Sequence, residues 1–164
     1  MKKILVFAVM MLSLSIGIAK AVNPPQQKEG LWSIHKQSID NPENKKSEST
    51  STICRSHAYD DYVHSMAKNR KGCTTVGEGF DGGKYSVDLR CVEAGTVVQS
   101  KGTTTYQGDT STHSETHATY TPALAGISEM TMIMDQKYVG SCPAGMQPGD
   151  LKDANGNVTH LWKH

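Results

Sequence analysis

The chain has 164 residues, of which 37% are hydrophobic and 20% are charged, and its formal net charge is +1. This length suits one domain of ordinary size. Binding to nucleic acid or to anionic lipid depends on many Lys and Arg contacts with phosphate, so the near-neutral charge argues against both kinds of partner.

The first 21 residues have the pattern of a cleavable secretory signal. Residues 1–3 are basic, residues 4–18 are apolar, and residues 19–21 read Ala-Lys-Ala, which suits a cleavage site. The apolar run is shorter than the roughly 20 residues of a transmembrane helix. We therefore expect export to the periplasm, with the extracellular medium as the alternative. The remaining 143 residues, with a net charge of −2, contain no predicted membrane segment.

Two strands and one helix are predicted next, after a flexible lead-in over residues 22–29. Apolar and polar residues alternate over residues 30–39, and residues 47–55 are rich in Ser and Thr, so both segments favour strands. Ser56 is suited to cap a helix, because its hydroxyl can accept a hydrogen bond from the first turn. Gly72 is placed to end that helix. One apolar face recurs at helical spacing, formed by Tyr59, Tyr62, Val63 and Met66.

From residue 74 onward the pattern has a period of two. We predict strands over residues 74–80, 84–93, 96–107 with a bulge at Gly102, 110–121 up to a break at 122–126, 127–139, and 158–162. Turn signals separated by about one strand length indicate a mainly β fold. We expect residues 30–164 to form a single domain, an antiparallel meander that makes a small barrel, a curved sheet or a sandwich, with one short α-helix.

Four cysteines, an even number in an exported chain, predict two disulfides. Of the three possible pairings we favour Cys54–Cys73, which closes a short excursion, and Cys91–Cys142, which ties one strand to another. A zinc site is the competing interpretation, but the chain has no C-x₂-C pair and no clustered Cys and His spacing. No metal is predicted.

Several short motifs occur together in a characteristic order. They are Gly30-Leu31-Trp32, Cys54 before the helix, Cys91 at the end of an alternating strand, Met130-Thr131-Met132, and Gly140-Ser141-Cys142-Pro143. Together they resemble the bacterial family catalogued as domain of unknown function 3617, over essentially the whole chain after the signal. The resemblance implies a small exported protein of Gram-negative bacteria and assigns no catalytic residue. Arg55-Ser56 departs from the Met-Thr-Pro-like helix start of that family.

Three methionines in the last long strand are the most unusual feature. Alternation places Met130, Met132 and Met134 on one face. Flexible Met side chains fill apolar cores or line apolar pockets. Copper handling is the alternative, since thioethers bind Cu(I), but same-face residues about 7 Å apart do not easily converge on one ion. With Trp32 and Tyr85, these methionines are the candidates for facing a ligand.

Catalytic groupings are missing from the sequence. The chain has no Gly-x-Ser-x-Gly elbow, and its Gly-rich stretches are followed by strands rather than helices. His113 and His117 lie four apart in a predicted strand, too far to share a metal. We therefore predict no catalytic residue, no enzyme activity and no cofactor. The favoured hypothesis is a periplasmic module that binds a small apolar ligand or an envelope protein. The alternatives are a structural or envelope-stress protein without a pocket and a copper-handling protein.

Overall fold

The computed structural model describes residues 24–162, so the predicted signal over residues 1–21 lies outside the described residues. Nine strands and one helix follow in the order β1 (Gly30–Asn41), β2 (Lys45–Arg55), α1 (His57–Lys68), β3 (Cys73–Asp81), β4 (Lys84–Glu93), β5 (Thr96–Gln107), β6 (Ser111–Leu124), β7 (Ile127–Gly140), β8 (Asp150–Asp153) and β9 (Val158–His160). No helix within this part of the chain is long and apolar enough to cross a membrane.

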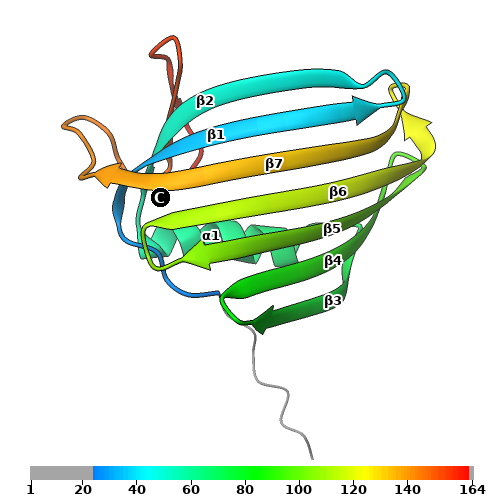
Figure 1. The fold of residues 1–164 in the computed structure, drawn as a ribbon, viewed down its shortest axis with the longest axis horizontal. Coiled ribbons are helices and arrows are strands. Elements are labelled where there is room, and N and C mark those ends of the chain that lie inside the picture. The colour runs from blue at the N-terminus through cyan, green and yellow to red at the C-terminus, as the bar shows by residue number, and fades with distance from the viewer. Residues whose placement is uncertain (1–23, 163–164) are drawn as a thin grey trace, which may run out of the picture.

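The nine strands form one antiparallel sheet in the order β3-β4-β5-β6-β7-β1-β2-β8-β9. Strands β3 to β7 follow one another as a meander. Strand β1 pairs with β7, so the first strand of the sequence lies next to the last strand of the meander. The sheet curves strongly around α1, which crosses its concave side (Figure 1). The predicted mainly β antiparallel fold with one short helix is confirmed, and among the predicted shapes it is the curved sheet.

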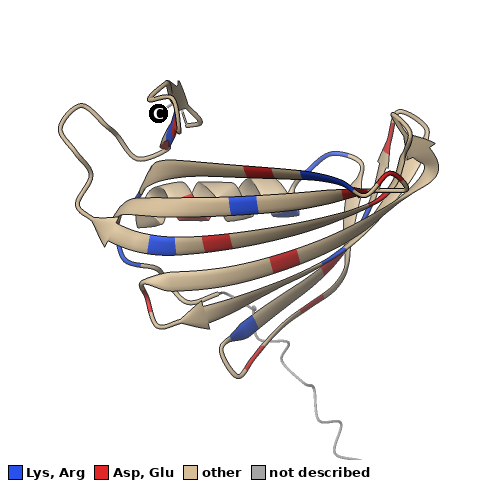
Figure 2. Ribbon diagram, turned by 45° about the horizontal axis from the view of Figure 1, so that its top comes forward, with Lys and Arg blue, Asp and Glu red and all other residues tan. Residues whose placement is uncertain are grey.

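The strand register decides which residues share a face, because directly opposed residues of an antiparallel ladder point to the same side. One row across the concave face contains Ile34 on β1, Gln136 on β7, Thr112 on β6 and Tyr106 on β5. The intervening residues form a polar convex face. Charged residues of both signs are scattered along the strands rather than gathered in one patch (Figure 2).

The core lies under the first turn of α1, where the sheet and the helix meet. Trp32 is fully buried and packs with Ile53 and Tyr59. Its ring meets that of Tyr138 edge-on, with 6.1 Å between the centroids. Burial of about 150–250 Å² by one Trp corresponds to roughly 4–6 kcal/mol as an upper estimate, so this residue anchors the concave face.

Two disulfides are present, as predicted, but the predicted pairing is wrong. The bonds join Cys73 to Cys91 and Cys54 to Cys142. The first pair is directly opposed in the β3–β4 hairpin, with 3.9 Å between the Cα atoms. The second follows from the insertion of β1, because Leu31 pairs with both Cys54 and Gly140, which brings the chain after β7 close to the end of β2.

The helix ends earlier than the sequence suggested. Ser56 caps it as predicted, but the last helical residue is Lys68 and the C-cap is Asn69. Gly72 instead belongs to the turn that leads into β3, where its φ is +81° and an added Cβ would lie 2.7 Å from the carbonyl oxygen of Val92. Close approach of two backbones, rather than helix termination, therefore requires the glycine.

Other differences concern the strands. The predicted bulge at Gly102 is absent, since β5 keeps its register with both neighbours there, and the register shift lies instead between Thr75 and Gly77 in β3. Strand β6 continues through Pro122 to Leu124 rather than stopping before it. Strand β8 was not predicted, because its four residues stand among turn signals; it pairs with the nearby β9 and with the distant β2.

Candidate functional site

A cleft with a volume of about 370 Å³ lies between α1 and the concave face of the sheet. This volume falls within the range of roughly 300–1,000 Å³ that is usual for small-molecule sites. Six apolar side chains contribute to its wall, from β1, β2, α1, β7, β8 and the end of the chain: Ile34, Ile53, Val63, Met134, Leu151 and Leu161. Its polar side chains include the ion-paired Arg55 and Asp60.

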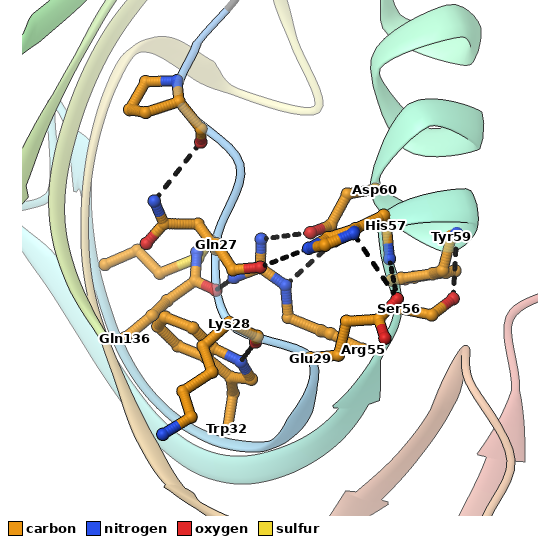
Figure 3. A network of polar contacts seen from close by, with 12 residues as sticks. Gln27, Lys28, Glu29, Trp32, Arg55, Ser56, His57, Tyr59, Asp60 and Gln136 are labelled. Carbon is orange, nitrogen blue, oxygen red and sulfur yellow. Dashed lines mark hydrogen bonds and ion pairs between the residues drawn. The ribbon is translucent and has the colours of Figure 1, made fainter. Parts of the chain in front are cut away.

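The start of α1 is attached to the sheet by a partly buried ion pair. The Ser56 hydroxyl accepts a hydrogen bond from the amide of Tyr59. Arg55, the residue before this cap, donates from Nε and Nη2 to the two carboxylate oxygens of Asp60, both at 2.9 Å (Figure 3). The two side chains are 15% and 17% exposed. A paired geometry of this kind holds the helix in one orientation.

Arg55 is also held on the side away from Asp60. Its Nη1 donates to Oε1 of Gln136 at 3.2 Å, and its guanidinium lies 4.6 Å from the centre of the Trp32 ring. The indole N–H of Trp32 in turn donates to the carbonyl of Lys28 at 2.8 Å (Figure 3). The positive charge of Arg55 is therefore balanced by a carboxylate and packed against an aromatic ring, rather than presented to the cleft as a free cation.

The end of α1 is fixed to β3 by a second set of polar contacts. Lys68 Nζ lies 3.1 Å from Oε1 of Glu78, and the Tyr85 hydroxyl donates to the same oxygen at 2.6 Å. The hydrogen bond from Tyr85 is the main cause that lowers the pKa of Glu78, while burial raises the pKa of Tyr85. The helix α1, which forms the roof of the cleft, is therefore attached to the sheet by a partly buried ion pair at its start and by a more exposed one at its end.

Two buried polar atoms near the ion pair lack hydrogen-bond partners among residues 24–162. One is the hydroxyl of Thr112, a residue of β6 that contributes to the cleft wall, and the other is Oε1 of Gln27. Gln27 lines an adjoining cavity of about 340 Å³, which shares Arg55, Asp60 and Tyr106 with the cleft. Buried polar groups are nearly always paired, so one exception in each of two adjoining cavities marks a polar part of the site.

The lead-in segment forms one wall of this adjoining cavity. The carbonyl of Gln27 is 3.0 Å from Nε2 of His57, and the carboxylate of Glu29 accepts from the amide of His57 at 2.8 Å (Figure 3). The amide of Lys28 donates to the carbonyl of Asp109 at 2.8 Å. Residues 24–29, expected from the sequence to be a flexible lead-in, therefore bridge α1 and the β5–β6 turn.

All five predicted ligand-facing residues lie on the concave face. Met130, Met132 and Met134 oppose β1 residues of the same face as Trp32, and Tyr85 reaches that face from β4. Only Met134 lines the cleft. Trp32 belongs to the core, Tyr85 is bound to Glu78, and the other two methionines continue in successive rows along β7, so the three thioethers are spread along the strand rather than brought together.

His113 and His117, which the sequence predicted to be too far apart to share a metal, lie on the opposite, convex face. His113 contacts Asp135 at 2.7 Å and Glu115 at 3.2 Å, and its pKa is raised chiefly by the hydrogen bond to Asp135. His117 contacts Thr131 instead. Within the described part of the chain, no three His, Cys, Asp or Glu side chains are grouped so that they could hold a metal ion.

Comparison with known proteins identifies the family. A family model described as "Protein of unknown function (DUF3617)" matches residues 27–142, well over half of the chain. The chain belongs to this family. The DUF3617 match confirms the resemblance seen in the sequence motifs, and it includes every residue that lines the cleft except Leu151 and Leu161.

Other comparisons add little to the DUF3617 assignment. A search of curated proteins finds no match. Among solved structures, the S-type phycobiliprotein lyase CPES from Guillardia theta aligns with a TM-score of 0.37 and 8% sequence identity, over 70% of this chain and 89% of that one. We draw nothing about function from a similarity this low.

The central polar residues of the site, Arg55, Gln136 and Thr112, were not among the predicted site residues. One signal for the ion pair was present in the sequence. Arg55 precedes the helix cap, and Asp60 stands at the fourth helical position, which are the two positions joined by a hydrophobic contact in many helix starts. Opposite charges at these positions could have predicted the pair. Thr112 is one Thr among many, and the sequence offers no signal that singles it out.

Proposed function

We propose that this protein is an exported binding module that holds a small apolar or amphipathic ligand in the cleft between α1 and the concave face. The observation that supports this most directly is the cleft itself, which has ligand-sized volume and a wall that combines six apolar side chains with two tyrosines and several polar groups. These are the usual properties of small-molecule sites. A protein acting only through its surface has no need of such a cleft, so the alternative without a pocket is less well supported.

The structure of the roof supports a site that is formed in advance. Ion pairs at both ends attach α1 to the sheet, through Arg55 and Asp60 at its start and through Lys68 and Glu78 at its end. A ligand that enters a preformed cleft avoids the entropic cost of ordering its walls. The half-buried methionines at 130 and 132 extend the apolar surface of the concave face beyond the roof, so a long ligand has a continuous path along β7.

We place this function in the periplasm. The predicted signal over residues 1–21 supports export, and two disulfides fit an oxidising compartment. Cell fractionation, followed by mass measurement of the purified chain, tests this part of the proposal. We expect the mature protein to begin at Val22, and a full-length chain in the cytoplasm would contradict it.

Ligand binding is tested with the neutral fluorescent probe N-phenylnaphthylamine, whose emission rises in an apolar site. We expect saturable enhancement by the mature, oxidised protein. Ser114→Phe should abolish it, because Ser114 lines the cleft opposite Met134 and a phenyl ring would fill the space. Ser86→Phe is the matched control, since Ser86 is exposed on the convex face. Circular dichroism confirms that both variants are folded.

Native mass spectrometry of protein purified from the periplasm provides an independent measurement. We expect a fraction of the molecules to carry an additional mass that organic solvent removes. A wild-type protein that gives no probe enhancement and only the mass of the polypeptide would refute the proposal. Equal loss of enhancement in both phenylalanine variants would also count against the cleft as the site.

A further inference from the structure

The Thr112 hydroxyl has an unusual environment in the cleft. Thr112 is 4% exposed and stands on the concave face between Tyr106 of β5 and Gln136 of β7. Its oxygen has no hydrogen-bond partner among the described residues. A buried hydroxyl left in this state costs about 1–3 kcal/mol. The position is therefore unfavourable for folding unless another molecule supplies the missing hydrogen bond.

Two polar side chains of the cleft wall, those of Gln136 and Arg55, are already engaged. Gln136 accepts from Arg55 through Oε1, and its Nε2 donates to the sulfur of Met134 at 3.3 Å. Arg55 uses Nε and Nη2 on Asp60. Among the described residues of the cleft wall, Thr112 is the one with a buried side-chain oxygen that lacks a hydrogen-bond partner.

The second unpartnered atom, Oε1 of Gln27, further restricts the chemical class of the ligand's polar group. Oε1 of Gln27 is an acceptor only, and it is buried in a residue that is 4% exposed and lines the adjoining cavity. An acceptor is satisfied only by a group that donates a proton. An ionised carboxylate or phosphate ester has only acceptors, whereas a hydroxyl or a primary amide has both functions.

The charges of the cleft wall also favour an uncharged ligand group. Arg55 and Asp60 are the formally charged side chains among the described residues of the cleft wall, and they neutralise each other. His64 also lines the wall from α1. An anionic group placed beside the pair would meet the Asp60 carboxylate without an unpaired cation, and burial of an uncompensated charge is strongly unfavourable.

We propose that the cleft selects apolar chains that end in an uncharged hydrogen-bonding group, a hydroxyl or an amide, over chains that end in a carboxylate. The terminal group hydrogen-bonds to the Thr112 hydroxyl, and the chain lies along the aliphatic wall. This inference rests on the binding function proposed above, and it adds the class of ligand.

Competition for the bound fluorescent probe tests this inference, with decanol, decanamide and decanoate as ligands of equal chain length. We expect decanol and decanamide to displace the probe at concentrations at least about tenfold lower than decanoate does. Thr112→Val replaces the hydroxyl by a methyl group of similar size. This substitution should lower the affinity for decanol and decanamide by about three- to tenfold and leave the affinity for decanoate unchanged.

Thr116→Val is the matched control. Thr116 lies on the same strand and the same face, two rows further along, and it does not line the cleft, so its replacement should leave all three ligands unaffected. Thr112→Val removes an unpaired polar atom and should unfold no earlier than the wild type on heating, which separates lost recognition from lost folding.

The outcomes separate the two proposals. If decanoate competes as well as decanol, the inference about the polar group is wrong and the binding function stands. The same conclusion follows if Thr112→Val leaves the ratio of the affinities for decanol and decanoate unchanged while both still displace the probe. If none of the three ligands displaces the probe and the probe itself does not bind, the binding function fails, and this inference fails with it.

Discussion

Replacement of Arg55 by Met should destabilise the protein far more than the loss of an ordinary surface ion pair. The change removes two charge-assisted hydrogen bonds to Asp60, one hydrogen bond to Gln136 and a cation–π contact with Trp32. It also leaves the Asp60 carboxylate, which is 17% exposed, without its cation. Breaking a fully buried pair costs about 3–5 kcal/mol.

Two features of the structure reduce this figure. The pair is not fully buried, and Asp60 stands in the first turn of α1, where the helix dipole favours a negative charge by about 0.3–1 kcal/mol. We therefore expect Arg55→Met to lower the free energy of unfolding by about 2–4 kcal/mol. Combination with Asp60→Asn in a double-mutant cycle should give a coupling energy of about 2 kcal/mol.

Urea denaturation followed by tryptophan fluorescence measures these values, with the disulfides intact. Arg70→Met is the control, because Arg70 contacts Glu93 at 2.8 Å but the two side chains are 61% and 64% exposed. Such a pair contributes about 0–1 kcal/mol. A coupling energy below about 0.5 kcal/mol between Arg55 and Asp60 would refute the reasoning, since it would place them with exposed pairs.

Two further predictions concern the convex face and the hairpin disulfide. Because the pKa of folded His113 is raised, chiefly by Asp135, this residue stabilises the protein below the ordinary histidine pKa of about 6.5 and loses that effect as pH rises through the folded pKa. Asp135→Asn should lower the His113 pKa in an NMR titration, and no change would contradict the assignment. Replacement of Cys73 and Cys91 by Ser should cost about 3 kcal/mol in chemical denaturation, less than loss of the other disulfide, which spans 88 positions rather than 18. A larger loss of stability on removal of the Cys73–Cys91 bond than on removal of the Cys54–Cys142 bond would contradict this prediction.

The hairpin disulfide was within reach of the sequence. The predicted strands over residues 74–80 and 84–93 leave a turn at residues 81–83, which makes β3 and β4 a hairpin. Counting outward from the observed pair of Asp81 and Lys84 puts Cys91 opposite Thr74. The bulge between Thr75 and Gly77 moves the register by one and places Cys73 there instead. Without the bulge, the hairpin register already places Cys91 within one position of Cys73. Attention to this register would therefore have favoured the Cys73–Cys91 pairing over the pairing that we predicted.

The other disulfide and the cleft depend on contacts that a linear pattern does not contain. Cys54 meets Cys142 only because β1 inserts between β2 and β7, which joins segments 88 positions apart. Met134 lines the cleft whereas Met130 lies beyond it, although alternation gives both the same face. The difference comes from the length and placement of α1, not from the strand.

The sequence by itself determined much of the local structure of this protein: most of the long strands from their composition and alternation, the turns from their glycines, and the start of the helix from Ser56. It also determined that the three methionines share a face, since a period of two is a property of the strand itself. Only the tertiary structure decided which strands are neighbours and which part of the concave face α1 covers. It also decided that Thr112 is left without a partner, because these depend on register and curvature between segments far apart in the chain.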